Sequence, residues 1–279
     1  LFEHAFFGIS ASESSAMDPQ QRLLLQLSYE SLHDTGLTKA QLLGSCIAVN
    51  VGQWESEFAS VLVNTPAGLS VYAATGSQCS VTCGRVSFVL GLHGPCSSFN
   101  TACSSSLVAN HSSLRALQYN ECEGAVSAGS NMILSATAMR GIGIGGFTSA
   151  TGRSHTFDVR ADGYARGEAI ETVMCEPDRN AQASSNGRML GSAVRQDGRS
   201  ASLTAPSGQA QQGVLTAALA DARRRPKEFT MLEAHGTGTA LGDPIETGAL
   251  ASVLLDHNDN ARPTLEIASL KANAGHTEP

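Results

Sequence analysis

The sequence is poor in charge, lacks a basic excess and contains no long apolar run. Only 15% of its 279 residues are charged while 42% are hydrophobic, which excludes a disordered chain and favours a globular, well-buried one. Acidic residues prevail, giving a formal net charge of −7, so nucleic acid and anionic membranes are not expected as main partners. No apolar run reaches the roughly 18 residues that span a bilayer, so no membrane span is predicted.

A secretory leader and a disulfide framework are also missing. The first residues, Leu1 to Phe7, have neither a basic region nor a sustained apolar core, and the chain does not begin with methionine. Seven irregularly spaced cysteines favour reduced thiols and a cytoplasmic location, although an organelle stays open because the N-terminus is expected to be incomplete. Cys79, Cys83, His93 and Cys96 could suggest zinc, but no second close pair completes a tetrahedral set, so no metal is predicted.

Strong helix signals begin at Asp18. Asp18 is predicted to cap a helix with Pro19 in its first turn, Gln21 is predicted to complete a capping box, and Gly36 to end the helix. Helical spacing places an inward face at Leu23, Leu24, Leu27 and Leu32.

Strands and helices then alternate, which indicates an α/β protein. A polar stretch at 178–187 suggests a junction between an N-terminal half, 1–180, and a C-terminal half, 186–279. Strands are predicted at 46–52, 124–134, 169–175, 189–195, 229–234 and 265–270. Further helices are predicted from Cys103 onward, at 209–224 with a cap near Ser207, and at 243–255. The last of these helices is predicted to begin with a second capping box, Asp243 to Glu246.

Cys103 is surrounded by small residues, in the stretch Asn100-Thr-Ala-Cys-Ser-Ser-Ser106, where a short strand gives way to a helix. The N–H groups and dipole at a helix N-terminus favour a thiolate, and a strand–turn–helix bend exposes a nucleophile beside a backbone N–H. A buried structural cysteine is the alternative.

Two histidines follow predicted strands. His235 precedes Gly-Thr-Gly-Thr239, and His276 follows the strand at 265–270. Ligand sites of α/β proteins collect at such strand ends. Each histidine alone would more often be structural, but the two together with an exposed Cys103 favour one site.

A glycine-rich stretch, residues 141–146, matches G-x-G-x-x-G. A dinucleotide-binding loop should follow a strand and open a helix, and neither pattern is present here. We therefore expect a mobile loop and no nucleotide.

Six stretches, in the order given, resemble the β-ketoacyl synthase (ketosynthase) domain of type I polyketide and fatty acid synthases. They are Phe6 to Ser10, Met17 to Leu25, Thr101 to Ser106, Phe157 to Glu168, Glu233 to Thr239 with Gly242 to Glu246, and Lys271 to Glu278. The resemblance covers nearly the whole chain. It implies a thiolase-like fold of two similar α/β halves, the second incomplete, and usually a homodimer.

The resemblance also implies decarboxylative Claisen condensation. Cys103 would carry the growing acyl chain as a thioester, while a malonyl-type extender arrives on the phosphopantetheine of an acyl carrier protein. His235 and His276 would donate hydrogen bonds to the enolate from neutral imidazoles, and no cofactor or metal would be bound directly.

Further residues are assigned on the same resemblance. Lys271, held by Asp243 or Glu246, would orient the histidine loops. The side chains that would bind the pantetheine arm are those of Thr237 and Thr239.

The chain departs from the family pattern in three ways. Asn100 stands where aspartate is usual, with a modest effect expected, the opening strand is missing before Leu1, and the rest of the second half is missing after Pro279. We therefore expect a fragment of a larger synthase with further domains, inactive alone. A fatty acid synthase condensing domain and a non-catalytic ketosynthase-like partner stay open as alternatives.

Overall fold

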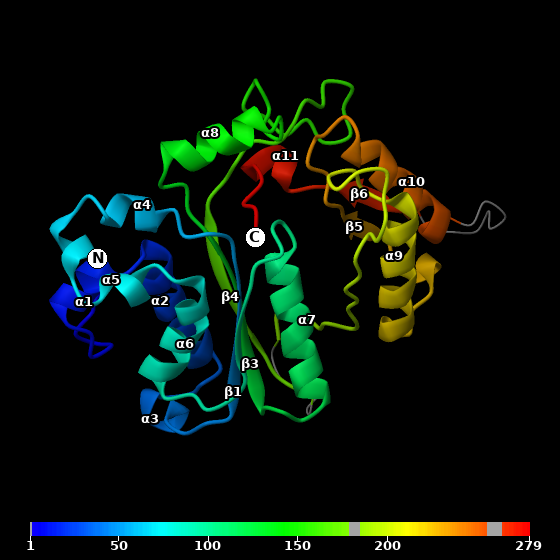
Figure 1. Ribbon diagram of the computed structural model, residues 1–279. Coiled ribbons are helices and arrows are strands. Elements are labelled where there is room, and N and C mark those ends of the chain that lie inside the picture. Colours follow the sequence, from blue (N-terminus) through cyan, green and yellow to red (C-terminus); the bar gives the residue numbers. More distant parts are fainter. Residues whose placement is uncertain (1, 179–184, 256–263) are drawn as a thin grey trace. The chain divides into compact units, whose positions relative to one another are not determined.

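The chain forms two compact units in the computed structural model, which describes residues 2–178, 185–255 and 264–279 (Figure 1). The first unit comprises Leu1–Met139, Glu168–Ser184 and Glu278–Pro279, and the second comprises Arg140–Gly167 and Ser185–Thr277. Each unit is therefore built from separate stretches of sequence, with 140–167 packing in the second. Part of the predicted junction, 179–184, lies outside the described residues.

The first unit is organised around a four-stranded sheet of order β2-β1-β3-β4. β1 pairs in parallel with β2 and β3, and β4 runs antiparallel to β3. The strands are β1 (Ile47–Gln53), β2 (Cys96–Phe99), β3 (Gly124–Asn131) and β4 (Ala169–Cys175). The predicted strands at 46–52 and 169–175 are thus confirmed, and the one at 124–134 ends three residues early.

Helices cover both faces of this sheet. α7 (Ser105–Gln118) lies on one face, and α2 (Pro19–Asp34) and α6 (Cys79–Leu90) lie on the other (Figure 1). This layering explains why β1 is buried along its whole length, as expected for a parallel strand between helices. Shorter helices complete the unit: α1 (Ala11–Ala16), α3 (Lys39–Leu42), α4 (Phe58–Leu62), the 3₁₀ helix η1 (Pro66–Leu69) and α5 (Ala73–Gly76).

α2 begins as the sequence predicts. The Asp18 carboxylate accepts the Gln20 N–H at 2.8 Å, Pro19 is the first helical residue, and Gly36 adopts φ 87° just beyond the helix. The capping box is wrong, because Gln21 turns inward and its amide oxygen accepts a hydrogen bond from Arg85 at 2.8 Å.

The inward face of α2 was predicted correctly at Leu24 and Leu32, but Leu27 is only half-buried and Leu23 is exposed. Leu24 and Leu32, eight residues apart, have no exposed surface, whereas the Leu23 side chain is 40% exposed. One residue along a helix corresponds to about 100° of rotation, so Leu23 falls outside the stripe that Leu24 and Leu32 define.

The second unit contains two parallel strands, β5 (Met231–Glu233) and β6 (Glu266–Ala268). α10 (Gly242–Leu254) packs against α9 (Gly208–Ala222), whose N-terminus is capped by Ser207 as predicted. Ala234, Leu250 and Leu254 form its apolar core. Its short elements are the 3₁₀ helix η2 (Pro226–Glu228) and α11 (Lys271–Ala274).

The strand predicted at 189–195 is wrong. Within the described ranges these residues have no regular structure, and the side chains of Met189, Leu190 and Val194 are 44–50% exposed. The Ser192 N–H donates to the Asp221 carboxylate at 2.8 Å, where a strand would donate to a neighbouring strand. Apolar content alone was therefore misleading here.

The glycine-rich stretch 141–146 lies at the C-terminal end of α8 (Ala136–Ile144). The prediction of a loop is wrong up to Ile144, because the helix runs through the first four residues of the stretch. These glycines end a helix, whereas those of a dinucleotide-binding loop open one. Over the part of the chain that the structure describes, no helix is long and apolar enough to cross a membrane.

Candidate active site

Cys103 occupies the turn between β2 and α7. β2 ends at Phe99, the N-cap of α7 is Ser104, and the thiol is partly exposed. The predicted strand–turn–helix arrangement is therefore confirmed, although the nucleophilic role of Cys103 stays a prediction. Directly before it, Ala102 adopts φ 53°, a left-handed conformation that is unfavourable for a residue with a Cβ.

Hydroxyl side chains tie this turn together. The Thr101 N–H donates to Ser105 Oγ at 2.9 Å, and Ser105 Oγ donates to the Ala102 carbonyl at 2.7 Å. Ser104 Oγ donates to the Thr101 carbonyl at 3.0 Å. Asn100 contributes one long hydrogen bond, from the Ala102 N–H to its side-chain oxygen at 3.4 Å. The small residues around Cys103 thus support the turn as well as leaving space.

Glycine lets the start of α7 approach the sheet closely. A Cβ on Gly52 of β1 would lie 2.6 Å from the Ser105 carbonyl oxygen and closer still to Ser106 N. On β3, a Cβ on Gly129 would lie 3.0 Å from the Ser106 Cβ. Any larger residue at Gly52 would have to displace the helix that follows Cys103.

In the second unit, the two predicted histidines lie against each other. The ring centroids of His235 and His276 are 5.5 Å apart, with the ring planes at 86°. His235 follows β5 as predicted, but α11 intervenes between β6 and His276, so that histidine does not directly follow a strand. Tyr164 contacts the His276 ring edge-on at 5.0 Å between centroids.

His276 is fixed mainly through its backbone. Its N–H donates to the Ala165 carbonyl, and its carbonyl accepts the Gly167 N–H, both at 2.7 Å. The residue is 2% exposed. The backbone attachment fixes the main chain of His276, and burial against Tyr164 and His235 leaves its ring few alternative positions.

Two carboxylates hold the loop that begins at His235. Glu246 accepts the N–H groups of His235 and Gly236, at 2.6 and 2.8 Å. Asp243 accepts those of Gly238 and Thr239, at 3.1 and 3.2 Å. The capping box predicted for α10 is therefore wrong, because both carboxylates serve this loop and the helix's N-cap residue makes no side-chain cap.

Lys271 is not held by either carboxylate. Among the described residues, no acidic side chain forms a salt bridge with it, so the predicted pairing with Asp243 or Glu246 is not formed. Its positive charge acts instead on the imidazoles of His235 and His276.

Both imidazoles are biased toward the neutral form. Burial lowers the pKa of His276 to about 3, with smaller contributions from His235 and Lys271. The His235 side chain is more exposed, yet the groups around it displace enough water to lower its pKa. Lys271 lowers it further, and Glu246 and Asp243 oppose this. Neutral imidazoles can donate a hydrogen bond without carrying charge.

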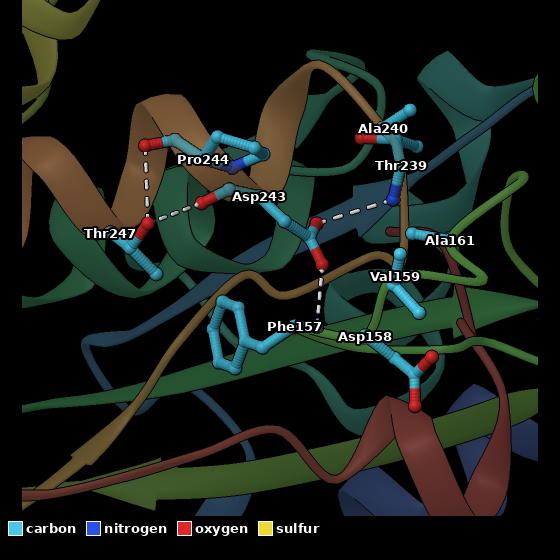
Figure 2. Close-up of a pocket in the computed structure, with 9 residues that line it drawn as sticks. All are labelled: Phe157, Asp158, Val159, Ala161, Thr239, Ala240, Asp243, Pro244 and Thr247. Atoms are coloured by element: carbon cyan, nitrogen blue, oxygen red, sulfur yellow. Dashed lines mark hydrogen bonds between the residues drawn. The ribbon is translucent and has the colours of Figure 1, made fainter.

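A pocket of about 390 Å³ opens beside the same loop (Figure 2). The two threonines predicted to bind substrate differ here, because Thr239 lines the pocket while Thr237 does not and is 7% exposed. The pocket is lined by Phe157, Asp158, Val159, Ala161, Thr239, Ala240, Asp243, Pro244 and Thr247.

The loop around Phe157 lies in one of the six matching stretches, but the sequence assigned it no role. The Phe157 N–H donates to Asp243 at 2.8 Å (Figure 2), and Thr156 Oγ1 donates to the Gly236 carbonyl at 2.5 Å. Gly163 donates to the Gly238 carbonyl at 2.9 Å. This loop is thus the second support of the His235 loop. The polar, glycine-containing sequence of this loop was the signal that could have indicated a role in the site.

Residues 1–181 match the family model for the N-terminal domain of β-ketoacyl synthases, and residues 186–279 match that for the C-terminal domain. The chain belongs to the β-ketoacyl synthase family.

Relatives and solved structures give the same result. The chain is 42% identical to the pikromycin polyketide synthase component PikAII of Streptomyces venezuelae and to the polyketide synthase GfsB of Streptomyces halstedii. Each match covers 99% of this chain but only 8% and 5% of those relatives. The ketosynthase from module 6 of the Bacillus subtilis bacillaene synthase matches with a TM-score of 0.89 at 31% identity, over 99% of this chain and 48% of that one. The thiolase-like fold is confirmed.

Proposed function

We propose that this chain forms the catalytic part of a polyketide ketosynthase that carries out decarboxylative condensation. The observation that carries the proposal is the packed pair of His235 and His276, both with lowered pKa values, in a chain whose Cys103 lies on a strand–turn–helix bend. The 42% identity to polyketide synthases supports this reading. It favours polyketide over fatty acid synthesis.

The proposed reaction has two stages. The Cys103 thiolate attacks an acyl thioester, and the acyl group becomes a Cys103 thioester as the carbon–sulfur bond to the carrier breaks. The carrier leaves as a thiolate, which takes up the proton that Cys103 had released. A malonyl-type thioester then loses carbon dioxide, and the electron pair of the broken carbon–carbon bond forms an enolate. The enolate carbon attacks the acyl-Cys103 carbonyl, and the Cys103 thiolate leaves as the new carbon–carbon bond forms.

In this reaction His235 and His276 would donate hydrogen bonds to the enolate oxygen of the extender. Developing negative charge is stabilised most by donors that are already oriented. Glu246 fixes the backbone of His235, and residues 165–167 fix that of His276, so both rings are oriented before substrate arrives. Lys271 would add a positive charge that lowers the pKa of both rings.

The proposal also names partners. The acyl groups would arrive on the phosphopantetheine arm of an acyl carrier protein, with Thr239 at the pocket edge as one contact for the arm. Other synthase domains would belong to the same protein, since relatives are far longer than this chain. A homodimer is proposed as well, and β2, an edge strand of its sheet with Cys96 exposed, offers backbone groups for pairing.

Separate assays of loading and decarboxylation test the proposal in the full-length protein. Cys103→Ala should abolish acyl loading, whereas His235→Ala and His276→Ala should load normally and lose carbon dioxide release by about a hundredfold or more. Loss of loading with decarboxylation intact in both histidine variants would refute the division of roles. If an acyl substrate labelled Cys46 or Cys122 in place of Cys103, the assignment of Cys103 as the nucleophile would be refuted.

A further inference from the structure

We propose that Ser105 is a positioning residue for Cys103, acting through the peptide group that joins Ala102 to Cys103. The inference rests on the proposed function, since it assigns how the nucleophile of that reaction is presented. Ser105 has no exposed surface, and its hydroxyl belongs to the turn and not to the helix that it begins.

The Ser105 hydroxyl acts both as a hydrogen-bond acceptor and as a hydrogen-bond donor. Its oxygen accepts the Thr101 N–H at 2.9 Å, and it donates to the Ala102 carbonyl at 2.7 Å. The Ser105 N–H reaches the same carbonyl at 3.1 Å. One side chain therefore joins two backbone groups on either side of Ala102, and the Ala102 carbonyl receives two hydrogen bonds from Ser105.

This fixes the direction of the Cys103 N–H. The Ala102 carbonyl and the Cys103 N–H belong to one planar trans peptide group, in which they point in opposite directions. Because the carbonyl is drawn toward Ser105, the N–H is turned away from it. In the proposed reaction, that N–H stabilises the oxyanion formed when Cys103 is acylated or attacked.

The turn needs such support because Ala102 has φ 53°. A residue with a Cβ does not keep this conformation unless its surroundings impose it. Without the Ser105 hydroxyl, the Thr101 N–H would lose its partner, and the Ala102 carbonyl would keep only the weaker 3.1 Å bond. The peptide before Cys103 could then rotate toward an unstrained conformation.

Ser113 provides a matched control. It lies on the same helix, α7, also has no exposed surface, and accepts a hydrogen bond from Asn50 Nδ2 at 2.9 Å. Ser105→Ala and Ser113→Ala therefore remove the same atom from equally buried positions. Only the first removal touches the turn that carries Cys103.

The test compares both variants in the full-length protein. Iodoacetamide alkylation of Cys103 is followed by peptide mapping as a function of pH, together with acyl loading and urea unfolding. We expect comparable losses of stability, but a loading rate at least tenfold lower and an altered pH profile of Cys103 alkylation for Ser105→Ala only. Ser105→Thr, which keeps the hydroxyl, should restore the alkylation profile.

Equal loading and alkylation in Ser105→Ala and Ser113→Ala would overturn the inference, as would a normal pH profile in a folded Ser105→Ala protein. If Ser105→Ala does not fold, Ser105→Thr decides alone, since a hydroxyl in the same place must preserve the wild-type profile. Failure of the wild-type protein to load acyl groups would instead contradict the proposed function. The alkylation profile would still report on Ser105.

Discussion

Glu246 binds His235 through the backbone: its carboxylate accepts the His235 N–H at 2.6 Å and the following N–H of Gly236 at 2.8 Å. A carboxylate that accepts two N–H groups holds a loop by two charge-assisted hydrogen bonds. Glu246 thus positions the imidazole through the backbone that carries it, since both of these hydrogen bonds are made to the main chain and neither to the ring. The backbone of residues 165–167 acts in the same indirect way on His276, whereas Tyr164 contacts the His276 ring itself.

Glu246→Gln should therefore impair decarboxylation while leaving acyl loading of Cys103 unchanged. The glutamine amide retains one accepting oxygen and loses the charge. The hydrogen bonds that hold the loop in place should therefore be weaker by about 1.5–3 kcal/mol. Carbon dioxide release should fall about tenfold to a hundredfold. Glu228→Gln is the control, because Glu228 pairs with Arg225 on the surface, away from the loop. Equal decarboxylation by the two variants would contradict the role of Glu246.

His276 should make stability depend on pH. Its pKa is lowered to about 3 in the folded state, against about 6.5 in the unfolded chain, so the unfolded state binds a proton first as the pH falls. The stabilisation that His276 provides is complete above pH 6.5. It is lost progressively below that pH, by up to about 1.4 kcal/mol per pH unit from this group.

Urea unfolding of wild type and His276→Gln between pH 7.5 and 4.5 measures this contribution. The variant is expected to be less stable at pH 7.5, but the difference in unfolding free energy between the two proteins should shrink as the pH falls. The carboxylates titrate in both proteins and cancel in the difference. A difference independent of pH would show that His276 is not held neutral.

Lys271→Met should raise the pKa of both His235 and His276, because the lysine charge disfavours their protonation. Histidine-labelled protein titrated by NMR gives both values directly. Lys227→Met is the matched control, since Lys227 lies in η2 and affects neither imidazole pKa. Unchanged imidazole pKa values in Lys271→Met would show that the lysine charge does not act on the two histidines.

Much of the fold and the position of the nucleophile could be predicted because their signals are local. Asp18 and Ser207 cap the helices that they precede, and the strand at 169–175 was predicted to the residue. Cys103 was predicted to lie where a short strand gives way to a helix, because the apolar residues that follow it have helical spacing. Caps, turns and periodicity are encoded within a few residues of where they act.

The supporting contacts of the site could not be predicted, since they join residues far apart in sequence. Asp243 and Glu246 had the spacing of a capping box, and only the folded chain brings the 235–239 backbone to them. Leu190 and Val194 had the composition of a strand, but a strand forms only with a partner, and the described residues offer none. Register and partner choice are tertiary properties.

Gly52→Ala should damage the nucleophile turn, although position 52 lies on a different strand from the one that leads to Cys103. An added Cβ would lie 2.6 Å from the Ser105 carbonyl oxygen and closer still to Ser106 N, so β1 or the start of α7 must shift. Overpacking against backbone in a buried layer costs about 1–3 kcal/mol. A displaced α7 N-terminus should also slow acyl loading of Cys103 in a folded variant.

The control for this prediction is Gly84→Ala. Gly84 lies within α6, and a Cβ there would meet no heavy atom within 4 Å. Alanine in a helix interior is favoured over glycine by about 0.5–1 kcal/mol, so Gly84→Ala should be neutral or stabilising and should load normally. Urea unfolding and acyl loading of both variants decide the matter. If Gly52→Ala matched Gly84→Ala in both measurements, the approach of α7 to β1 would be looser than the structure shows, and the turn that presents Cys103 would not depend on it.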